Sequence, residues 1–250
     1  MKMNRTAMKL TITTLLMANS LCFLHAADTS KLQIGLTDTY DFQAYKNQNN
    51  PNTVLPAIFY DSRYFYIDGD ELGFYGLNQD HHKLKFNLYY DSSEFKPSDE
   101  LKTLNKRKPS VMAGGSYTYI TQYGGFQVQA EQDILSRSHG AFATFAYLAE
   151  VNYGQWTFAP ELGIQWNSKK YNNYYYGVSA TEAQTSGLKE YHPKQSLQPY
   201  LSLDTGYQLN SRWTLYGGLQ FTGLSNQQYH SPMVEKHMDI STSLGFLYRF

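Results

Sequence analysis

The last ten residues, Ser241–Phe250, constrain the fold of this chain more than any other stretch. If the segment is extended, its side chains alternate between two faces, and one face carries Thr242, Leu244, Phe246, Tyr248 and Phe250. An aromatic face that continues to the final residue is unusual for a soluble domain, whose chain ends fray into water. It is typical of the closing strand of an outer-membrane β-barrel, whose outward face contacts lipid. The last strand of a soluble sandwich is the alternative.

The first residues predict a secretory signal peptide. Three basic residues precede the apolar run Leu10–Leu24, and small residues follow it up to Ala27, which is the order found in a cleavable signal. The run is shorter than the roughly 20 apolar residues that a transmembrane helix needs. We therefore expect residues 1–27 to be a signal peptide and residues 28–250 to form one β-barrel domain in the outer membrane of a Gram-negative bacterium.

The composition excludes several classes of protein. The single cysteine, Cys22, lies in the signal, and Leu21 before it argues against lipid attachment. The mature chain then has no thiol for disulfides, catalysis or metal binding. Removing the signal takes away three positive charges and no negative ones, and the slightly acidic remainder predicts no nucleic-acid partner. Aromatic residues make up 16% of the chain, including 23 tyrosines, which fits barrel strands because only alternate residues need be apolar.

Strand-length segments of alternating polarity recur through the mature chain. In Lys83–Asp91, for example, Leu84, Phe86 and Leu88 share one face, opposite Lys85. A lysine or arginine facing lipid near the membrane midplane would cost roughly 2–4 kcal/mol, so the charged residues of these segments should line the interior. The candidate lumen-lining residues are Lys85, Glu131, Asp133, Glu150, Glu161, Asp204, Arg212 and Arg249.

Parity limits the number of strands. Both ends of a bacterial barrel chain lie in the periplasm, so the number of strands is even. Nine segments from Leu72 onward read as strands, Tyr64–Ile67 makes ten, and Ala57–Tyr60 together with Lys31–Tyr40 makes twelve. We predict an antiparallel transmembrane barrel of twelve strands. Ten strands is the alternative, in which the region before the Tyr64 strand plugs the lumen.

The connections between the strands are either short turns or longer loops. No segment shows the 3.6-residue apolar period that predicts a helix. The longer connections are therefore expected to be irregular, and they are Asp41–Pro56, Ser92–Pro109, Ser168–Gln195 and Leu224–Asp239. Parity places the long Ser168–Gln195 loop at the extracellular end. Ala141–Tyr153 reads as one continuous strand.

The chain resembles one known family. Similarity to the MipA/OmpV family extends over LGFYGLNQDHHKLKFNLYY, KPSVMAGGSYTYITQYG, PELGIQWNS, Tyr171–Leu209, WTLYGGLQFTGLS and SPMVEK. The likeness covers nearly the whole mature chain, and Asp41–Pro56 is its poorest match. It implies an outer-membrane barrel with no established catalytic residues and no cofactor. The family's named member is a scaffold that links a lytic murein transglycosylase to a bifunctional penicillin-binding protein, and other members are described as porin-like or adhesion-related.

These observations give several functional hypotheses. The resemblance favours a scaffold for peptidoglycan-remodelling proteins, with a lytic transglycosylase and a penicillin-binding protein as partners. The alternatives are a narrow porin-like channel for small polar solutes or a surface adhesin. A wide pore is not expected, because twelve strands are close to the number at which side chains fill the interior. An enzyme is not expected either, because His81 and His82 have no further metal ligand at a recognisable spacing.

Two groups of aromatic residues are candidates for contacts. The candidate assembly signal, similar to the one that the barrel-assembly machinery reads, is Phe246, Tyr248 and Phe250. The candidate loop contact is Tyr174, Tyr175 and Tyr176. Tyrosine offers a large contact area at low entropic cost, and an aromatic girdle is the other interpretation. The basic run Lys106–Lys108 reads as a solvated loop, with the phosphates of lipopolysaccharide as the alternative contact. Outer-membrane lipid completes the expected partners.

Overall fold

The computed structural model describes residues 31–47 and 52–250, and the signal-peptide prediction lies outside these residues. In chain order the strands are β1 (Lys31–Phe42), β2 (Asn52–Asp61), β3 (Phe65–Asp68), β4 (Glu71–Asn78), β5 (His82–Asp91), β6 (Ser110–Thr121), β7 (Gly124–Asp133), β8 (Ala141–Leu148), β9 (Val151–Tyr153), β10 (Trp156–Asn167), β11 (Ser196–Gln208), β12 (Trp213–Gly223) and β13 (Met238–Arg249). The helices are α1 (Lys169–Tyr176), α2 (Ala180–Ser186), α3 (Asn226–Tyr229) and a short 3-10 helix, Asp99–Leu101. None of the helices in these residues is long and apolar enough to cross a membrane.

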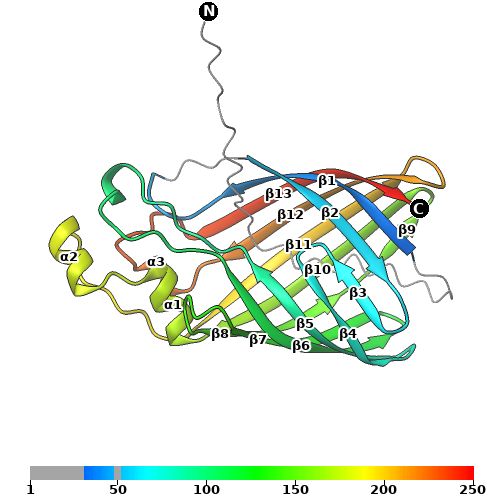
Figure 1. Cartoon of the computed structure of the whole chain (residues 1–250), viewed down its shortest axis with the longest axis horizontal. Coiled ribbons are helices and arrows are strands. Elements are labelled where there is room, and N and C mark those ends of the chain that lie inside the picture. Colours follow the sequence, from blue (N-terminus) through cyan, green and yellow to red (C-terminus); the bar gives the residue numbers. More distant parts are fainter. Residues whose placement is uncertain (1–30, 48–51) are drawn as a thin grey trace, which may run out of the picture.

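The strands form one closed antiparallel barrel (Figure 1). The barrel closes because β1 pairs with β13, with Ile34 opposite Tyr248 and Leu36 opposite Phe246. Strands β8 and β9 both pair with β10, so they are two parts of a single wall strand. The wall therefore has twelve strands, which confirms the predicted number. The ten-strand alternative is wrong because β1 and β2 belong to the wall.

The two ends of the barrel differ in their connections. Figure 1 shows the three α-helices together at one end and the C-terminus at the other, where several strands are joined by tight turns. Three expectations are corrected here. The Ser168–Gln195 connection contains α1 and α2, and Leu224–Asp239 contains α3 and the start of β13. Both ends of Asp41–Pro56 are strand, because β1 continues through Phe42 and β2 already begins at Asn52.

The barrel wall has the two chemical faces that the alternation predicts. On β10, Leu162, Ile164 and Trp166 are exposed on the outer surface, whereas the next residue, Asn167, is fully buried. In the interior, Phe59 of β2 contacts Tyr216 of β12 edge to face, with ring centroids 6.3 Å apart. Because a strand has a period of two, this contact fixes which residues of β2 face inward. Apolar side chains thus cover the lipid-facing surface, and the interior is largely polar.

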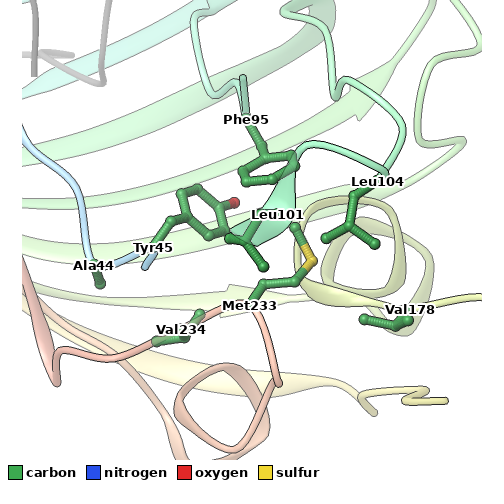
Figure 2. Packing of buried hydrophobic residues seen from close by; sticks show 8 residues of the cluster. All are labelled: Ala44, Tyr45, Phe95, Leu101, Leu104, Val178, Met233 and Val234. Carbon is green, nitrogen blue, oxygen red and sulfur yellow. The ribbon is translucent and has the colours of Figure 1, made fainter. Parts of the chain in front are cut away.

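The largest cluster of buried apolar residues lies outside the barrel wall, in the extracellular connections. Figure 2 shows its eight residues pointing toward one another around the Met233 side chain. They come from four separate connections, and they are Ala44, Tyr45, Phe95, Leu101, Leu104, Val178, Met233 and Val234. A second cluster packs α1 onto the barrel mouth, and it consists of Tyr89, Met112, Phe142, Tyr171 and Tyr175. We call these connections, with the two clusters, the cap.

Candidate functional site

A cavity lies inside the barrel directly below the cap. Its volume is about 90 Å³, which is small compared with the pockets of roughly 300–1,000 Å³ that hold drug-sized ligands. The lining is rich in amide and aromatic side chains. These include Gln43, Gln127, Gln129, Gln165, Gln198 and Gln220 together with Tyr45, Tyr89, Phe142, Tyr171, Tyr175, Tyr176 and Tyr200. We call this cavity the chamber.

The amides of the chamber are held in hydrogen-bonded rows along the wall. Gln129 Nε2 donates to Glu131 Oε1 at 3.0 Å, and Gln165 Nε2 donates to Asn167 Oδ1 at 2.8 Å. Asn167 in turn donates to Gln198 on the neighbouring strand. Each amide both donates and accepts hydrogen bonds, and the carboxyl side chains of Glu94, Glu161 and Asp239 also line the chamber. Such a surface suits water or a small polar solute that donates hydrogen bonds.

The cap is held by one buried ion pair. Arg107 Nη1 lies 2.8 Å from Glu182 Oε1, and the two side chains are 7% and 6% exposed. Arg107 also donates from Nε to the carbonyl of Tyr174 at 2.6 Å and from Nη2 to the carbonyl of Gly177 at 3.0 Å. These carbonyls belong to the C-terminal end of α1, where a positive charge is favourable. Arg107 therefore fastens both α1 and α2 to the connection between β5 and β6.

Glu182 is positioned by the start of its own helix. Ser179 caps α2: its hydroxyl accepts from the Glu182 N–H, and Glu182 accepts from the Ser179 N–H at 3.0 Å, which is a capping box. The backbone N–H of Asn105 donates to Glu182 Oε1 at 3.0 Å. Burial raises the pKa of this carboxyl, but the hydrogen bonds from Arg107, Ser179 and Asn105 outweigh burial and lower the pKa to about 2.

This lowered pKa predicts that the cap weakens in acid. A carboxyl with a folded-state pKa below its unfolded value stabilises the fold above the unfolded pKa, and loses that effect as the pH falls toward the folded pKa. Glu182 should therefore contribute ~3 kcal/mol to the cap at neutral pH, at 1.36 kcal/mol per pKa unit. That contribution should disappear between about pH 4.5 and about pH 2. Hydrogen exchange of the α1 and α2 amides across this range measures it.

The control for this measurement is Glu190→Gln, since Glu190 is an exposed carboxylate beside His192 in the same connection. Glu182→Gln should make the cap less protected at neutral pH and should flatten the change in protection with pH. Glu190→Gln should behave like the unmodified protein. Equal acid sensitivity in the Glu182→Gln variant and the unmodified protein would contradict the assignment.

Comparison with known proteins identifies the family. The model of the family described as MltA-interacting protein MipA matches residues 34–250. The chain belongs to the MipA family. The MltA-interacting protein of Escherichia coli (strain K12) is 34% identical over 249 residues, 98% of this chain and 100% of that protein. The outer membrane protein OmpV of Vibrio cholerae is 30% identical over 138 residues, 55% of this chain and 53% of that protein.

Among solved structures, an outer membrane channel from Pseudomonas putida F1 has a TM-score of 0.46 with 10% identity, over 90% of this chain and 97% of that chain. The MipA-family relatives that are named as outer membrane proteins, together with the barrel, place this chain in the outer membrane. The predicted family and location are therefore confirmed.

The structure places the predicted lumen residues of this MipA-family barrel in two settings. Lys85, Glu131, Asp133 and Asp204 are buried in wall strands, and Glu161 of β10 accepts a hydrogen bond from Tyr200. The others lie at strand ends or in connections, with Glu150 between β8 and β9, Arg212 in the turn before β12, and Arg249 at the end of β13. What these side chains do for function stays a prediction.

The two aromatic groups also differ in their surroundings. Tyr174, Tyr175 and Tyr176 all belong to α1 and pack against the clusters of the cap, and the Tyr175 side chain is buried. A partner would reach Tyr174 or Tyr176 more easily than Tyr175. Tyr248 and Phe250 stack edge to face at 4.9 Å between centroids, and Tyr248 and Phe246 also contact Trp213. The assembly and contact roles stay predictions.

Sequence reasoning missed the central residues of the cap. Arg107 was expected to be solvated or to contact phosphates, but its side chain is buried against Glu182. The reason is that α2 supplies a carboxylate 75 residues away in the chain. One signal was present in the sequence: Ser179-x-x-Glu182 has the spacing of a capping box. The chamber glutamines gave no such signal, because an amide on the polar face of a strand is common.

Proposed function

We propose that this MipA-family barrel is a scaffold that binds a lytic transglycosylase at the periplasmic face of the outer membrane and brings it near a penicillin-binding protein. The E. coli protein that is 34% identical to the whole chain is named for its interaction with MltA. That name supports a protein partner for this chain, and a lytic transglycosylase is the class that we propose. The role requires no catalytic residue, so we propose that the barrel is not an enzyme.

The observation that carries this proposal is the cap over the extracellular mouth. The cap packs two apolar clusters over the chamber and ties them with the buried pair of Arg107 and Glu182. Free diffusion of solutes would require this cap to move. The periplasmic turns are the end of the barrel that a peptidoglycan-remodelling enzyme can reach, and they present exposed aromatic side chains.

Two tyrosines at the periplasmic turns are suited to a contact. Tyr123 and Tyr153 are 76% and 78% exposed, which places them among the most exposed large side chains in the described residues. The turn around Tyr123 is fixed, because the hydroxyl of Tyr147 donates to the Tyr123 carbonyl. Beside Tyr153, Gly154 adopts a φ of +61°, which glycine tolerates without strain. Rigid tyrosines lose little entropy on binding.

Replacing both tyrosines with alanine should weaken partner binding. Truncation of an interface hot spot costs about 2 kcal/mol or more, so we expect at least ~30-fold lower affinity for a lytic transglycosylase. The measurement is capture of the purified transglycosylase by immobilised mature barrel. Tyr40→Ala is the matched control, because Tyr40 is an exposed outward tyrosine near the opposite end of the barrel. Equal loss in both variants would show a general effect on the barrel, and no binding by the unmodified barrel would refute scaffolding.

A narrow channel is the competing function, and conductance separates the two. The chamber is lined by polar side chains that suit small polar solutes. The cap covers the extracellular mouth, however, so we do not expect the barrel to conduct steadily. In planar bilayers we expect the unmodified protein to show no stable conducting state. A stable open state of the unmodified protein would favour transport over scaffolding.

A further inference from the structure

The barrel wall is incomplete beside β2. Strand β3 has only four residues, and it pairs with β2 only at Phe59, Tyr60 and Asp61. Figure 1 shows β3 as a short arrow beside the much longer β2. In the registers of the described strands, the outer half of β2 from Asn52 to Ala57 pairs with β1 and with no second strand. A closed barrel normally pairs both edges of every strand.

The backbone directions and the proline in the Asn52–Ala57 half of β2 agree with a free edge there. The N–H of Gly69 donates to the Ile58 carbonyl at 3.1 Å, so the backbone of Ile58 faces β3. Backbone direction alternates along a strand, and the backbones of Pro56 and Val54 therefore face the same side. Proline has no N–H to donate and is confined to edges within sheets. Among the described residues, no backbone group pairs with Val54 or Pro56 on that side.

This free edge borders a stretch of wall that has no strand pairing in the described residues, and we call this stretch the window. Below it lies the β3–β4 turn, where Tyr90 N–H of β5 donates to the Asp70 carbonyl at 2.9 Å. Above it, the β1–β2 connection is tied to the β5–β6 connection, since Ser98 Oγ donates to the Asn47 carbonyl at 2.9 Å. The chamber reaches this frame, because Gln43, Tyr89, Ser93 and Glu94 line it.

The frame carries buried polar atoms that lack partners in the described residues. The Tyr89 side chain is 0% exposed, yet its hydroxyl has no hydrogen-bond partner, and the same holds for Oδ1 of Asp68 and of Asp70. The hydrogen bond from the Tyr90 N–H to the Asp70 carbonyl places Asp70 beside the strand that carries Tyr89. Lys85 is the cation whose charge acts on Asp68. A buried acceptor without a donor destabilises the fold, so these oxygens favour a ligand that donates hydrogen bonds.

We infer that the window admits an amphiphile from the outer leaflet, whose hydrogen-bond-donating head meets Tyr89 and Asp70 while its alkyl chain lies along β2. The outward side chains Val54, Pro56 and Ile58 supply an apolar edge for the chain. The Leu55 side chain faces the interior of the barrel and is half-buried. An amine head and a hydroxyl-rich head share the required donors. A sulfate head has no hydrogen to donate. This inference does not depend on partner binding at the periplasmic turns.

The test uses a photoreactive residue that faces the lumen. The barrel carries p-benzoyl-phenylalanine in place of Leu55 and is reconstituted in phosphatidylcholine vesicles, whose headgroup donates no hydrogen bond. Dodecyl maltoside, dodecylamine or dodecyl sulfate is added, and adducts after irradiation are measured by mass spectrometry. We expect adducts with the maltoside, the amine or both, which separates the two head chemistries. Dodecyl sulfate should label at least ~10-fold less, since its head donates no hydrogen bond to the buried oxygens.

The control is the same photoreactive residue in place of Gln220. Gln220 lines the chamber, and both edges of its strand are paired, with Ser202 on one side and Ser241 on the other. It should give little or no adduct. Equal labelling at both positions would mean entry through an end of the barrel, and would overturn the lateral window. Absence of adducts at position 55, or equal labelling by dodecyl sulfate, would overturn the proposed ligand.

Discussion

Replacing Arg107 with alanine should open the cap. Its guanidinium makes four hydrogen bonds, to Glu182 and to the carbonyls of Tyr174, Gly177 and Asn105. Removing one partner of a buried ion pair costs about 3–5 kcal/mol, because the other charge is left buried and unpaired. The cost should fall on the cap and not on the barrel, whose strands are paired independently. Limited proteolysis should then cut within residues 168–195, where the unmodified protein resists.

Lys106→Ala is the matched control for this change. Lys106 is the neighbouring cation, with a side chain 45% exposed and 3.7 Å from Glu94. An exposed pair of this kind contributes about 0–1 kcal/mol, so the variant should resist the protease as the unmodified protein does. Arg107→Lys should recover only part of the protection, because lysine cannot make the forked contacts of arginine. Full resistance of the Arg107→Ala variant would show that the apolar clusters alone hold the cap.

Deletion of Phe250 should remove most of the protein from the outer-membrane fraction. The reason is recognition during assembly and not stability of the finished barrel. Phe250 is 74% exposed, and in the folded barrel its N–H donates to the Leu32 carbonyl at 3.1 Å. One such hydrogen bond contributes about 0.5–1.5 kcal/mol. Refolded in detergent, the shortened barrel should therefore be nearly as stable as the full one, while cells should degrade it in the periplasm.

Two measurements make this prediction specific. Immunoblots of membrane fractions give the level in cells, and thermal unfolding in detergent gives the stability. Phe42→Ala serves as the control, because Phe42 is also an exposed aromatic residue at the end of a wall strand. That variant should reach the membrane normally. Normal membrane levels after deletion of Phe250 would contradict an assembly signal, and severe loss of stability in detergent would assign the effect to folding.

The sequence by itself determined the barrel. Alternation in segments such as Lys83–Asp91 is imposed locally, because one side of each strand contacts lipid and the other contacts polar side chains. Parity then limited the number of strands to twelve or ten, and the pairing of β1 and β2 in the wall decided for twelve. The family could also be recognised from the sequence, because the resemblance to it extends over most of the mature chain. The matching family model covers residues 34–250.

The tertiary structure alone decided the cap, the chamber and the window. The cap joins residues such as Ala44, Phe95, Val178 and Met233 from four connections, and no local pattern encodes contacts over such distances. Helix α1, with the sequence KKYNNYYY, has no apolar period and forms because Ser168 caps it and Arg107 holds its last carbonyls. The length of β3 likewise depends on where along the wall the β3–β4 hairpin turns. Membrane contact leaves a residue-by-residue pattern, whereas packing among loops depends on long-range contacts that appear only after the barrel has closed.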